Sequence, residues 1–207
     1  RAGPPMVVAE PVDDGFKITG TVPWITGWGM YQEFMVGATL PDGESLFGVV
    51  PFEPRKGVSF SDPMKLAAME SAQTVSGQFE SWHMPKENVC FVRPKSWIQN
   101  NDMINVTLQG HFAIGCACAG LDIVYAAAQK RGHSFLLDAH SKLSAEVDEC
   151  RKMMTTHSGG DGESTKRGLA IRAQAIDLAV RCAHAAITAS GGAANSSLHP
   201  AQRVFRE

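Results

Sequence analysis

The periodicity of the apolar residues changes near residue 93. Before this point, short β-rich segments are separated by turn signals such as Asp13-Asp14-Gly15 and Pro41-Asp42-Gly43, a spacing that is typical of an antiparallel sandwich or barrel. After it, apolar residues recur at helical spacing. We therefore predict an α+β chain with two domains. An antiparallel β-barrel or sandwich spans residues 1–93, and an antiparallel helical bundle spans residues 94–207.

Six segments of the first domain are predicted as strands. In the last of them, Ser76, Gln78 and Glu80 alternate with apolar or small residues, as expected for a half-buried strand. The predicted strands are Met6–Glu10, Phe16–Thr19, Phe34–Thr39, Leu46–Pro51, Val58–Phe60 and Thr74–Trp82.

Three long helices are predicted in the second domain. The first, over residues 101–131, is apolar nearly all round, which indicates a buried central helix. The other two have apolar seams spaced 4,3,4,3,4, as helices that pack against each other in a bundle do. One seam is Leu136, His140, Leu143, Val147, Cys150 and Met154, and the other is Leu169, Ala173, Ile176, Val180, Ala183 and Ile187.

Composition excludes several classes of protein. The net charge of −2 and the lack of a basic patch argue against nucleic acid as a partner. No apolar run reaches the roughly 20 residues of a membrane span, so we expect a cytoplasmic protein.

Because the chain begins at Arg1 and ends on Glu207 without a tail, we also expect a piece of a longer protein. The five cysteines lack zinc-site spacing, and we expect small buried thiols in a reducing compartment and no metal site.

One short segment points to a cofactor. Trp24-Ile25-Thr26-Gly27 follows a strand and turn, Gly15 to Pro23. On an extended strand, Trp24 and Thr26 lie on the same side, so a flat aromatic face and a hydroxyl could hold a planar ring. The alternative is that Trp24 is a core aromatic and Thr26 a strand former.

The segment resembles the flavin-contacting strand of the acyl-CoA dehydrogenase superfamily, a W-[IV]-[TS]-[NG] sequence after a G-[FY]-x-[IVL]-x-G turn. Other segments match the superfamily in the same order. The matching segments are Met69–Thr74 with Phe79-Glu80 and Met84–Val89, Tyr125–Arg131, Thr188–Gly192 and His199–Glu207. The resemblance implies the middle β-domain and the C-terminal helical domain of that superfamily, without the N-terminal helical domain.

The resemblance also implies FAD as the cofactor, with Trp24, Ile25 and Thr26 beside the isoalloxazine. The Thr26 hydroxyl would lie near the flavin nitrogen that accepts hydride. Arg131 would approach the pyrophosphate, for which a guanidinium is well suited. The alternative for Arg131 is a solvated arginine at a helix C-terminus.

The resemblance also implies a role for the glycine pair near the end of the chain. Gly191 and Gly192 would let the backbone approach the cofactor of a neighbouring subunit, or they simply end the third helix. Thr188 stands where the family has glutamine. The resemblance implies a homotetramer or homodimer, with the helix Phe112–Ala128 buried between subunits.

The reaction implied is oxidation of an acyl-CoA thioester to its α,β-enoyl form, which needs a carboxylate base. No residue is assigned as that base, since one family position lies beyond Glu207 and the other falls at Gly110 or His111. Gln202 and the sequence Trp24 to Gly29 are closer to the reduced-flavin monooxygenases of the superfamily, in which His111 could donate a proton to the substrate. A non-catalytic assembly module is the third alternative.

Overall fold

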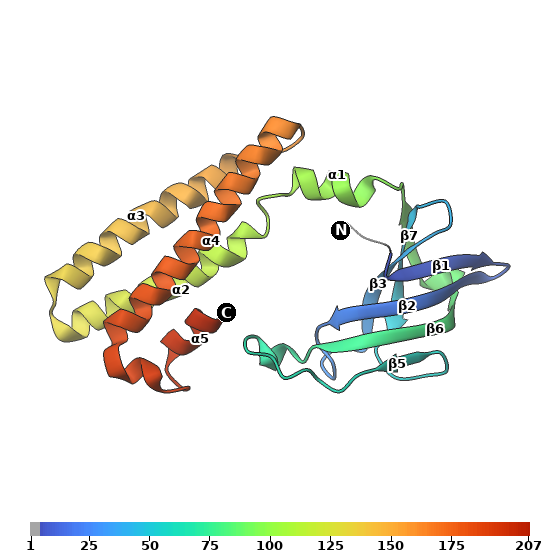
Figure 1. Cartoon of the computed structure of the whole chain (residues 1–207), viewed down its shortest axis with the longest axis horizontal. Helices are drawn as coiled ribbons and strands as arrows, with labels where there is room; N and C mark the ends of the chain where they lie inside the picture. Colours follow the sequence, from blue (N-terminus) through green and yellow to red (C-terminus); the bar gives the residue numbers. More distant parts are fainter. Residues whose placement is uncertain (1–4) are drawn as a thin grey trace. The chain divides into compact units, whose positions relative to one another are not determined.

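The structure is a computed structural model that describes residues 5–207. The chain divides into two compact units between Asn100 and Asn101, somewhat after the boundary predicted at 93/94. The first unit holds the strands and the second holds the long helices (Figure 1). The start of the chain at Arg1 lies outside the described residues.

The first unit is a seven-stranded sheet. The six predicted strands are all present, and a seventh follows them before the helices begin. The strands are β1 Val7–Val12, β2 Gly15–Ile25, β3 Glu33–Thr39, β4 Ser45–Pro51, β5 Val58–Phe60, β6 Val75–Pro85 and β7 Val89–Arg93.

The sheet is open and mixed, so it is neither a closed barrel nor wholly antiparallel, and the predicted antiparallel barrel or sandwich is confirmed only as a β-sheet domain. Its strand order is β5-β6-β2-β1-β3-β4-β7, and the two edge strands do not pair. The strand β3 lies on the other side of β1 from β2 and runs parallel to β1, to which a single pairing joins it, Val8 with Thr39. The other neighbouring strands pair antiparallel.

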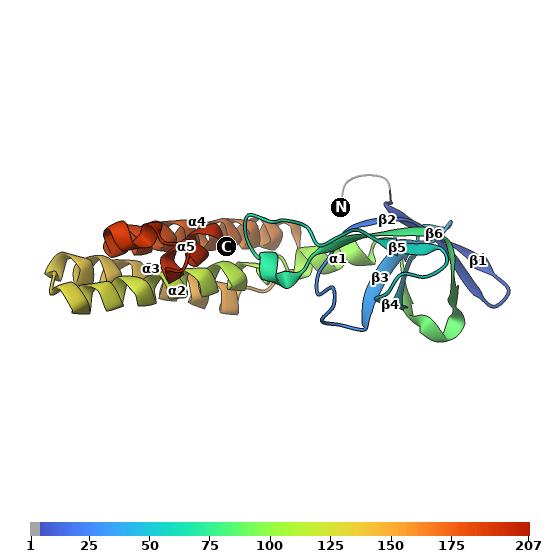
Figure 2. The same cartoon turned by 90° about the horizontal axis from the view of Figure 1, so that it is seen from below.

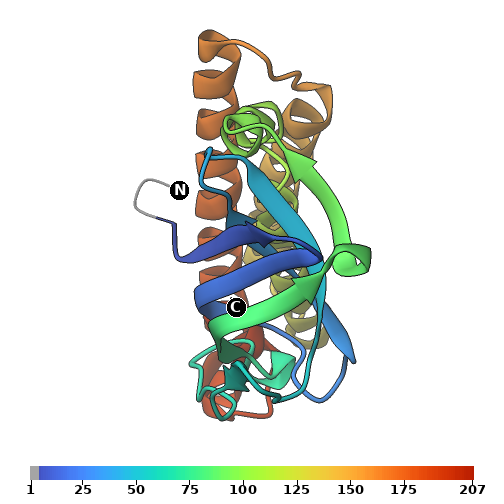
Figure 3. The same cartoon turned by 90° about the vertical axis from the view of Figure 1, so that its right-hand side faces the viewer.

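One apolar core fills the inner face of this sheet. Inward residues alternate along each strand, and Ile18 and Phe79 are fully buried at its centre. Figure 3 shows β6, β2 and β1 side by side, in the order that they have in the sheet. Because the inward side chains come from every part of the sheet, this core fixes which residues of each strand remain at the surface.

The second unit is helical, and the first of the three long helices predicted for it is interrupted. The helix α1 Trp97–Ile104 crosses the boundary between the units, and the helices within the second unit are α2 Gly110–Arg131, α3 Ser134–Thr156, α4 Gly162–Ser190 and α5 Pro200–Arg206. A helix had been predicted without interruption over 101–131. The turn at residues 105–109 separates α1 from α2. In it the backbone N–H groups of Leu108 and Gly110 donate to the carbonyl oxygens three residues back, at 3.0 and 2.9 Å, as in a tight turn rather than an α-helix.

The helices α2, α3 and α4 pack side by side around one apolar core (Figure 2). The seam predicted for α3 is confirmed at Val147, Cys150 and Met154, which are buried. By length and composition α2 also passes as a membrane span, but its residues Ile114 and Leu121 belong to this core.

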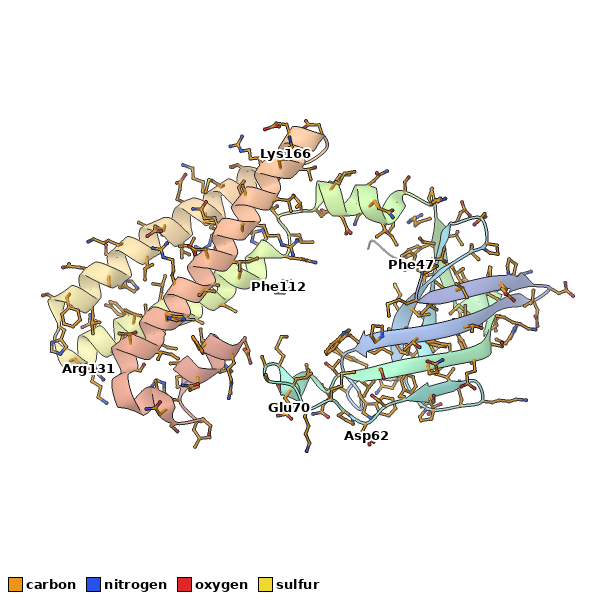
Figure 4. All side chains as sticks on the ribbon, in the orientation of Figure 1. Phe47, Asp62, Glu70, Phe112, Arg131 and Lys166 are labelled. Carbon is orange, nitrogen blue, oxygen red and sulfur yellow. The ribbon has the colours of Figure 1, made fainter. Side chains whose placement is uncertain are left out.

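The seam predicted for α4 is wrong over its first four positions, whereas Ala183 is buried and Ile187 packs against an apolar cluster, as predicted. The face of α4 that packs on α2 and α3 is Ile171, Ala175, Leu178 and Cys182, whereas Ile176 of the predicted seam is 50% exposed. Both faces of α4 are apolar, so periodicity alone could not select the inner one. The same ambiguity affects α2, where Phe112 was expected to be buried but is 79% exposed (Figure 4).

The five cysteines are free thiols, and the expected burial is found for Cys150 and Cys182 but not for Cys90, which is exposed, or for Cys116 and Cys118, which are half-buried. Burial raises the pKa of Cys182 to about 11 and also raises the pKa of Cys150. These two thiols are therefore protonated at neutral pH, and they serve as small apolar side chains in the helical core.

Two glycines of α2 should respond in opposite directions to replacement by alanine. A Cβ at Gly120 would lie 2.8 Å from the carbonyl oxygen of Cys182, whereas a Cβ at Gly115 meets no atom within 4 Å. Gly120→Ala should lower the free energy of unfolding by about 1–3 kcal/mol through overpacking. Gly115→Ala should raise it by up to about 1 kcal/mol through helix propensity. Urea denaturation followed by circular dichroism measures both, and equal effects would contradict the packing described.

Candidate functional site

A β-bulge at the end of β2 presents the aromatic–hydroxyl pair. Val22 pairs with Gly77 and Ile25 pairs with Val75, so β2 has an extra residue between these pairs. Bulges redirect side chains and are common beside active sites. Trp24 is 60% exposed, and Thr26 is also exposed. The structure therefore leaves both groups available to a ligand rather than in the core.

The neighbouring residue Ile25 points the other way. Its side chain is 5% exposed and packs with Phe52 and Val75 in a small core of its own. The side chain of Ile25 is therefore part of this core, because strand alternation turns it inward. The cofactor contact expected for Ile25 stays a prediction.

A second loop holds the segment that follows Thr26. The backbone N–H of Gly27 donates to the carbonyl oxygen of Ala72 at 2.8 Å, and that of Trp28 donates to Gln73 at 3.0 Å. Met69 and Gln73 both have positive φ angles, 56° and 49°, which are uncommon for residues other than glycine. Such backbone strain is frequent at functional sites, and sequence reasoning had not singled out these two residues as site candidates.

Gly27 is needed for the shape of this turn. Its φ is +94°, and a Cβ there would lie 2.3 Å from a ring carbon of Tyr31. The Tyr31 ring thus lies against the Gly27 backbone while remaining 64% exposed. Trp24, Thr26 and Tyr31 are exposed residues from one short stretch of the β-unit.

In the helical unit, the predicted residues Arg131 and Gly191 come together. Arg131 lies at the C-terminal end of α2 (Figure 4), and its Nη2 donates to the carbonyl oxygen of Ser190 at 2.9 Å. A Cβ on Gly191 would lie 3.3 Å from the same nitrogen. Arg131 and Ser190, which are 59 positions apart in the sequence, are therefore in contact. Gly191 leaves space beside the guanidinium because it has no side chain.

The backbone at this point ends α4. Gly191 has φ +62° and ψ −144°, and its N–H donates to the carbonyl oxygens of Ile187 and Thr188. The side chain of Thr188 is exposed, as is Gly192, where a Cβ would meet no atom within 4 Å. The capping role considered for the glycine pair thus applies to Gly191, and it does not exclude a cofactor role.

Sequence reasoning missed Ser190, which holds Arg131 in place. Ser190 is 7% exposed, and its hydroxyl donates to the carbonyl oxygen of Ala186 at 2.7 Å. Its position just before the glycine pair was the available signal. Among residues 5–207, Arg131 has no carboxylate in an ion pair with it, so its remaining N–H groups are available for an anion.

The positions considered for the catalytic base offer no carboxylate. A Cβ at Gly110 would lie 2.9 Å from the methyl group of Met154, so the backbone there is closely packed. His111 is exposed rather than inside the helical core. Asp102 lines a hollow of about 350 Å³ in the helical unit together with Arg172, and no predicted cofactor residue lies there.

Each of the two groups of candidate residues offers a chemistry of its own. Trp24 and Thr26 in the β-unit offer a ring face and a hydroxyl, which suit a planar heterocycle. Arg131 and Gly191 in the helical unit offer a guanidinium that has no ion-pair partner among residues 5–207, with space beside it that suits a phosphate.

Alanine replacements at the glycine pair distinguish the two positions. Gly191→Ala should lower the free energy of unfolding by about 1–3 kcal/mol, because its backbone conformation is costly for a residue with a Cβ. Gly192→Ala should change stability by less than about 0.5 kcal/mol, since it is exposed and meets no neighbour. Urea denaturation of the two variants checks this, and a neutral Gly191→Ala would contradict the cap geometry.

Solved structures share this fold over nearly the whole chain. The glutaryl-coenzyme A dehydrogenase glutaryl-CoA complex matches with a TM-score of 0.77 and 17% identity, over 97% of this chain and 55% of that one. Butyryl-CoA dehydrogenase from Megasphaera elsdenii gives 0.75 and 18%, over 98% and 57%. Dibenzothiophene monooxygenase from Paenibacillus sp. A11-2 gives 0.73 and 15%, over 98% and 62%.

No family model and no curated protein matches the sequence. The chain spans about 55 to 62% of the length of the three solved chains named above. The order of a curved sheet followed by packed long helices is common to them and to this chain, in agreement with the resemblance seen in the sequence. The chain therefore has the fold of the acyl-CoA dehydrogenase superfamily.

Proposed function

We propose that the chain is part of a flavin-dependent oxidoreductase that binds FAD. The observation that carries the proposal is the exposure of Trp24 and Thr26 on one side of the β2 bulge, while Ile25 between them is buried. An exposed tryptophan is costly to leave in water, and a ring stacked on it would remove apolar surface from solvent. The fold shared with acyl-CoA dehydrogenases supports the same proposal.

Trp24, Thr26 and Arg131 have different roles in binding the cofactor and in stabilising its charge. Trp24 supports one face of the isoalloxazine, and the Thr26 hydroxyl donates a hydrogen bond to it. Such a bond strengthens as negative charge develops, so it stabilises the transition state more than the ground state. Arg131, oriented by the Ser190 carbonyl, binds a phosphate oxygen of the cofactor. When bound, FAD supplies the hydride acceptor.

The substrate that we propose first is an acyl-CoA thioester, oxidised to its α,β-enoyl form. Two of the solved structures with this fold are a glutaryl-CoA and a butyryl-CoA dehydrogenase. The base that removes the α-proton is not assigned to any described residue. In the parent protein, anaerobic addition of butyryl-CoA should bleach the bound flavin if this reaction is the right one.

A monooxygenase that uses reduced flavin and oxygen is the second candidate. The exposed imidazole of His111 favours it, because this group could donate a proton to a substrate. A monooxygenase of aromatic substrates also has this fold. Under the anaerobic test above, this reaction predicts no bleaching by an acyl-CoA.

We also propose that the protein self-associates as a homotetramer or homodimer. The helical unit exposes large apolar side chains, and Phe112 is 79% exposed. Helices that are apolar on several faces are normally buried on several faces. A soluble chain covers such surfaces by association, most often with a closed symmetry.

Replacing Arg131 tests the cofactor proposal. Arg131→Gln should raise the dissociation constant for FAD about 10- to 100-fold, because a charge-assisted hydrogen bond of roughly 1.5–3 kcal/mol is lost. Titration of the chain with FAD, followed by the visible spectrum of the bound flavin, measures the constant. Arg151→Gln, which removes an exposed arginine on α3, is the matched control and should leave it unchanged. Equal affinity in both variants would contradict the phosphate role of Arg131.

A further inference from the structure

A polar hollow lies where the end of α1 and the turn after it meet the first turns of α4. Its volume is about 350 Å³, and all the residues that line it belong to the helical unit. Small-molecule sites have volumes of about 300–1,000 Å³, so this hollow has the size for a small organic molecule but not for a dinucleotide. None of the residues assigned to FAD lines it.

Close backbone packing fixes the shape of the hollow. A Cβ on Gly159, in the hairpin after α3, would lie 2.7 Å from the carbonyl oxygen of Ile104, so this hairpin touches the end of α1. A Cβ on Gly168 of α4 would overlap the side chain of Val106, a buried residue of the turn that lines the hollow. The hollow is therefore bounded by packed segments rather than by exposed side chains alone.

Two opposite charges line the hollow without neutralising each other. The carboxylate of Asp102 and the guanidinium of Arg172 both line it. They form no ion pair with each other, and neither has an ion-pair partner elsewhere among residues 5–207. Arg172 is half-buried, and taking a guanidinium out of water has a cost that a partner of opposite charge offsets. The hollow thus offers one cationic and one anionic group to a ligand.

The hollow also has a neutral acceptor and an apolar wall. The amide nitrogen of Asn105 donates to the backbone and side-chain oxygens of Asn101 at 3.0 and 3.2 Å, which leaves the amide oxygen of Asn105 available as an acceptor. Leu169 lines the hollow and is 50% exposed. An aliphatic group that covers Leu169 would remove apolar surface from water.

A buried nitrogen close to the hollow makes no hydrogen bond. Nε2 of His157 is buried and has no partner in the part of the chain that the structure describes. A Cβ on Gly168 would lie 2.7 Å from this nitrogen and would also overlap Val106, so His157 and the lining residue Val106 are neighbours. Buried polar groups nearly always have a partner, and a polar group that reached past Val106 would gain this hydrogen bond.

We propose that this hollow binds a free α-amino acid with a short aliphatic side chain. Arg172 binds the carboxylate, for which a guanidinium is well suited. Asp102 binds the ammonium group, and the aliphatic side chain covers Leu169. A zwitterion is favoured over a simple anion or cation, because either of these would leave one charge of the hollow without a partner. The inference concerns binding only and depends neither on FAD nor on self-association.

Calorimetric titration of the unaltered chain with three probes tests the pairing of charges. The probes are L-leucine, isocaproate, which is leucine without its amino group, and isoamylamine, which is leucine without its carboxylate. L-leucine should bind at least about tenfold more tightly than either analogue, because each analogue loses one charge-assisted hydrogen bond. L-leucine that binds no more tightly than isocaproate or isoamylamine, or not at all at about 10 mM, would overturn the proposal.

Variants of the two charged residues test the location. Arg172→Gln and Asp102→Asn should each raise the dissociation constant for L-leucine about tenfold or more. In Arg172→Gln, L-leucine and isoamylamine should bind with similar affinity, since the carboxylate has lost its partner. The matched controls are Arg167→Gln on α4 and Asp122→Asn on α2, both exposed and outside the hollow, and they should change nothing. Equal effects of Arg172→Gln and Arg167→Gln, in variants shown by circular dichroism to be folded, would overturn the site.

These measurements are separate from those on the cofactor. A chain that binds FAD but not L-leucine contradicts the amino-acid site and leaves the flavin proposal intact. A chain that binds L-leucine through Arg172 and Asp102 but does not bind FAD supports the amino-acid site and contradicts the flavin proposal.

Discussion

The close crossing of α2 and α4 at Gly120 is the constraint on which the helical part of the site depends. A glycine there lets the α2 backbone approach the carbonyl oxygen of Cys182, since a Cβ would lie only 2.8 Å from it. Both helices then run on together to their ends, where Arg131 of α2 reaches the Ser190 carbonyl at the end of α4. A wider separation of the two helices would leave the guanidinium without its acceptor, and the space beside Gly191 would lose its cation.

In the β-unit, the site depends on two features of β2: its side chains alternate between the core and the surface, and its β-bulge contains one extra residue. The core fixes Ile25 inward, and the bulge shortly before it sets Trp24 and Thr26 outward together. The loop that carries Ala72 then holds the backbone after Thr26 through a short hydrogen bond. The aromatic and hydroxyl groups are thus positioned by elements that are themselves well packed, as a binding surface requires.

Much of this arrangement could be predicted from the sequence. The strands could be predicted because one face of the sheet is buried, which gives a clear two-residue period. The buried seam of α3 around Val147 could be predicted because that helix has one apolar face only. The seam of α4 was misassigned for the opposite reason: Ile176 and Leu178 both lie on apolar faces, and the choice between them depends on tertiary packing. The parallel pairing of β3 with β1 likewise depends on tertiary structure.

The candidate site could likewise be predicted from the sequence only in part. Trp24, Thr26, Arg131 and Gly191 were recognised from a family resemblance, and the structure supplies what a pattern cannot: Ile25 is turned away. The interaction between Arg131 and Ser190 joins residues far apart in the chain, and no local period encodes such a contact. Its acceptor is a backbone carbonyl, which every residue type provides, so residue identity alone gave little reason to choose Ser190.

The central claim is that the face of Trp24 supports the flavin ring. The most direct measurement is the fluorescence lifetime of FAD bound to the chain, because an indole in contact with the ring quenches its emission. Bound FAD should show a strongly shortened lifetime that lengthens in Trp24→Leu and stays short in Trp97→Leu, whose indole packs with Phe47 and Phe91. A lifetime that is unchanged in Trp24→Leu, or a chain that binds no FAD, would contradict the account.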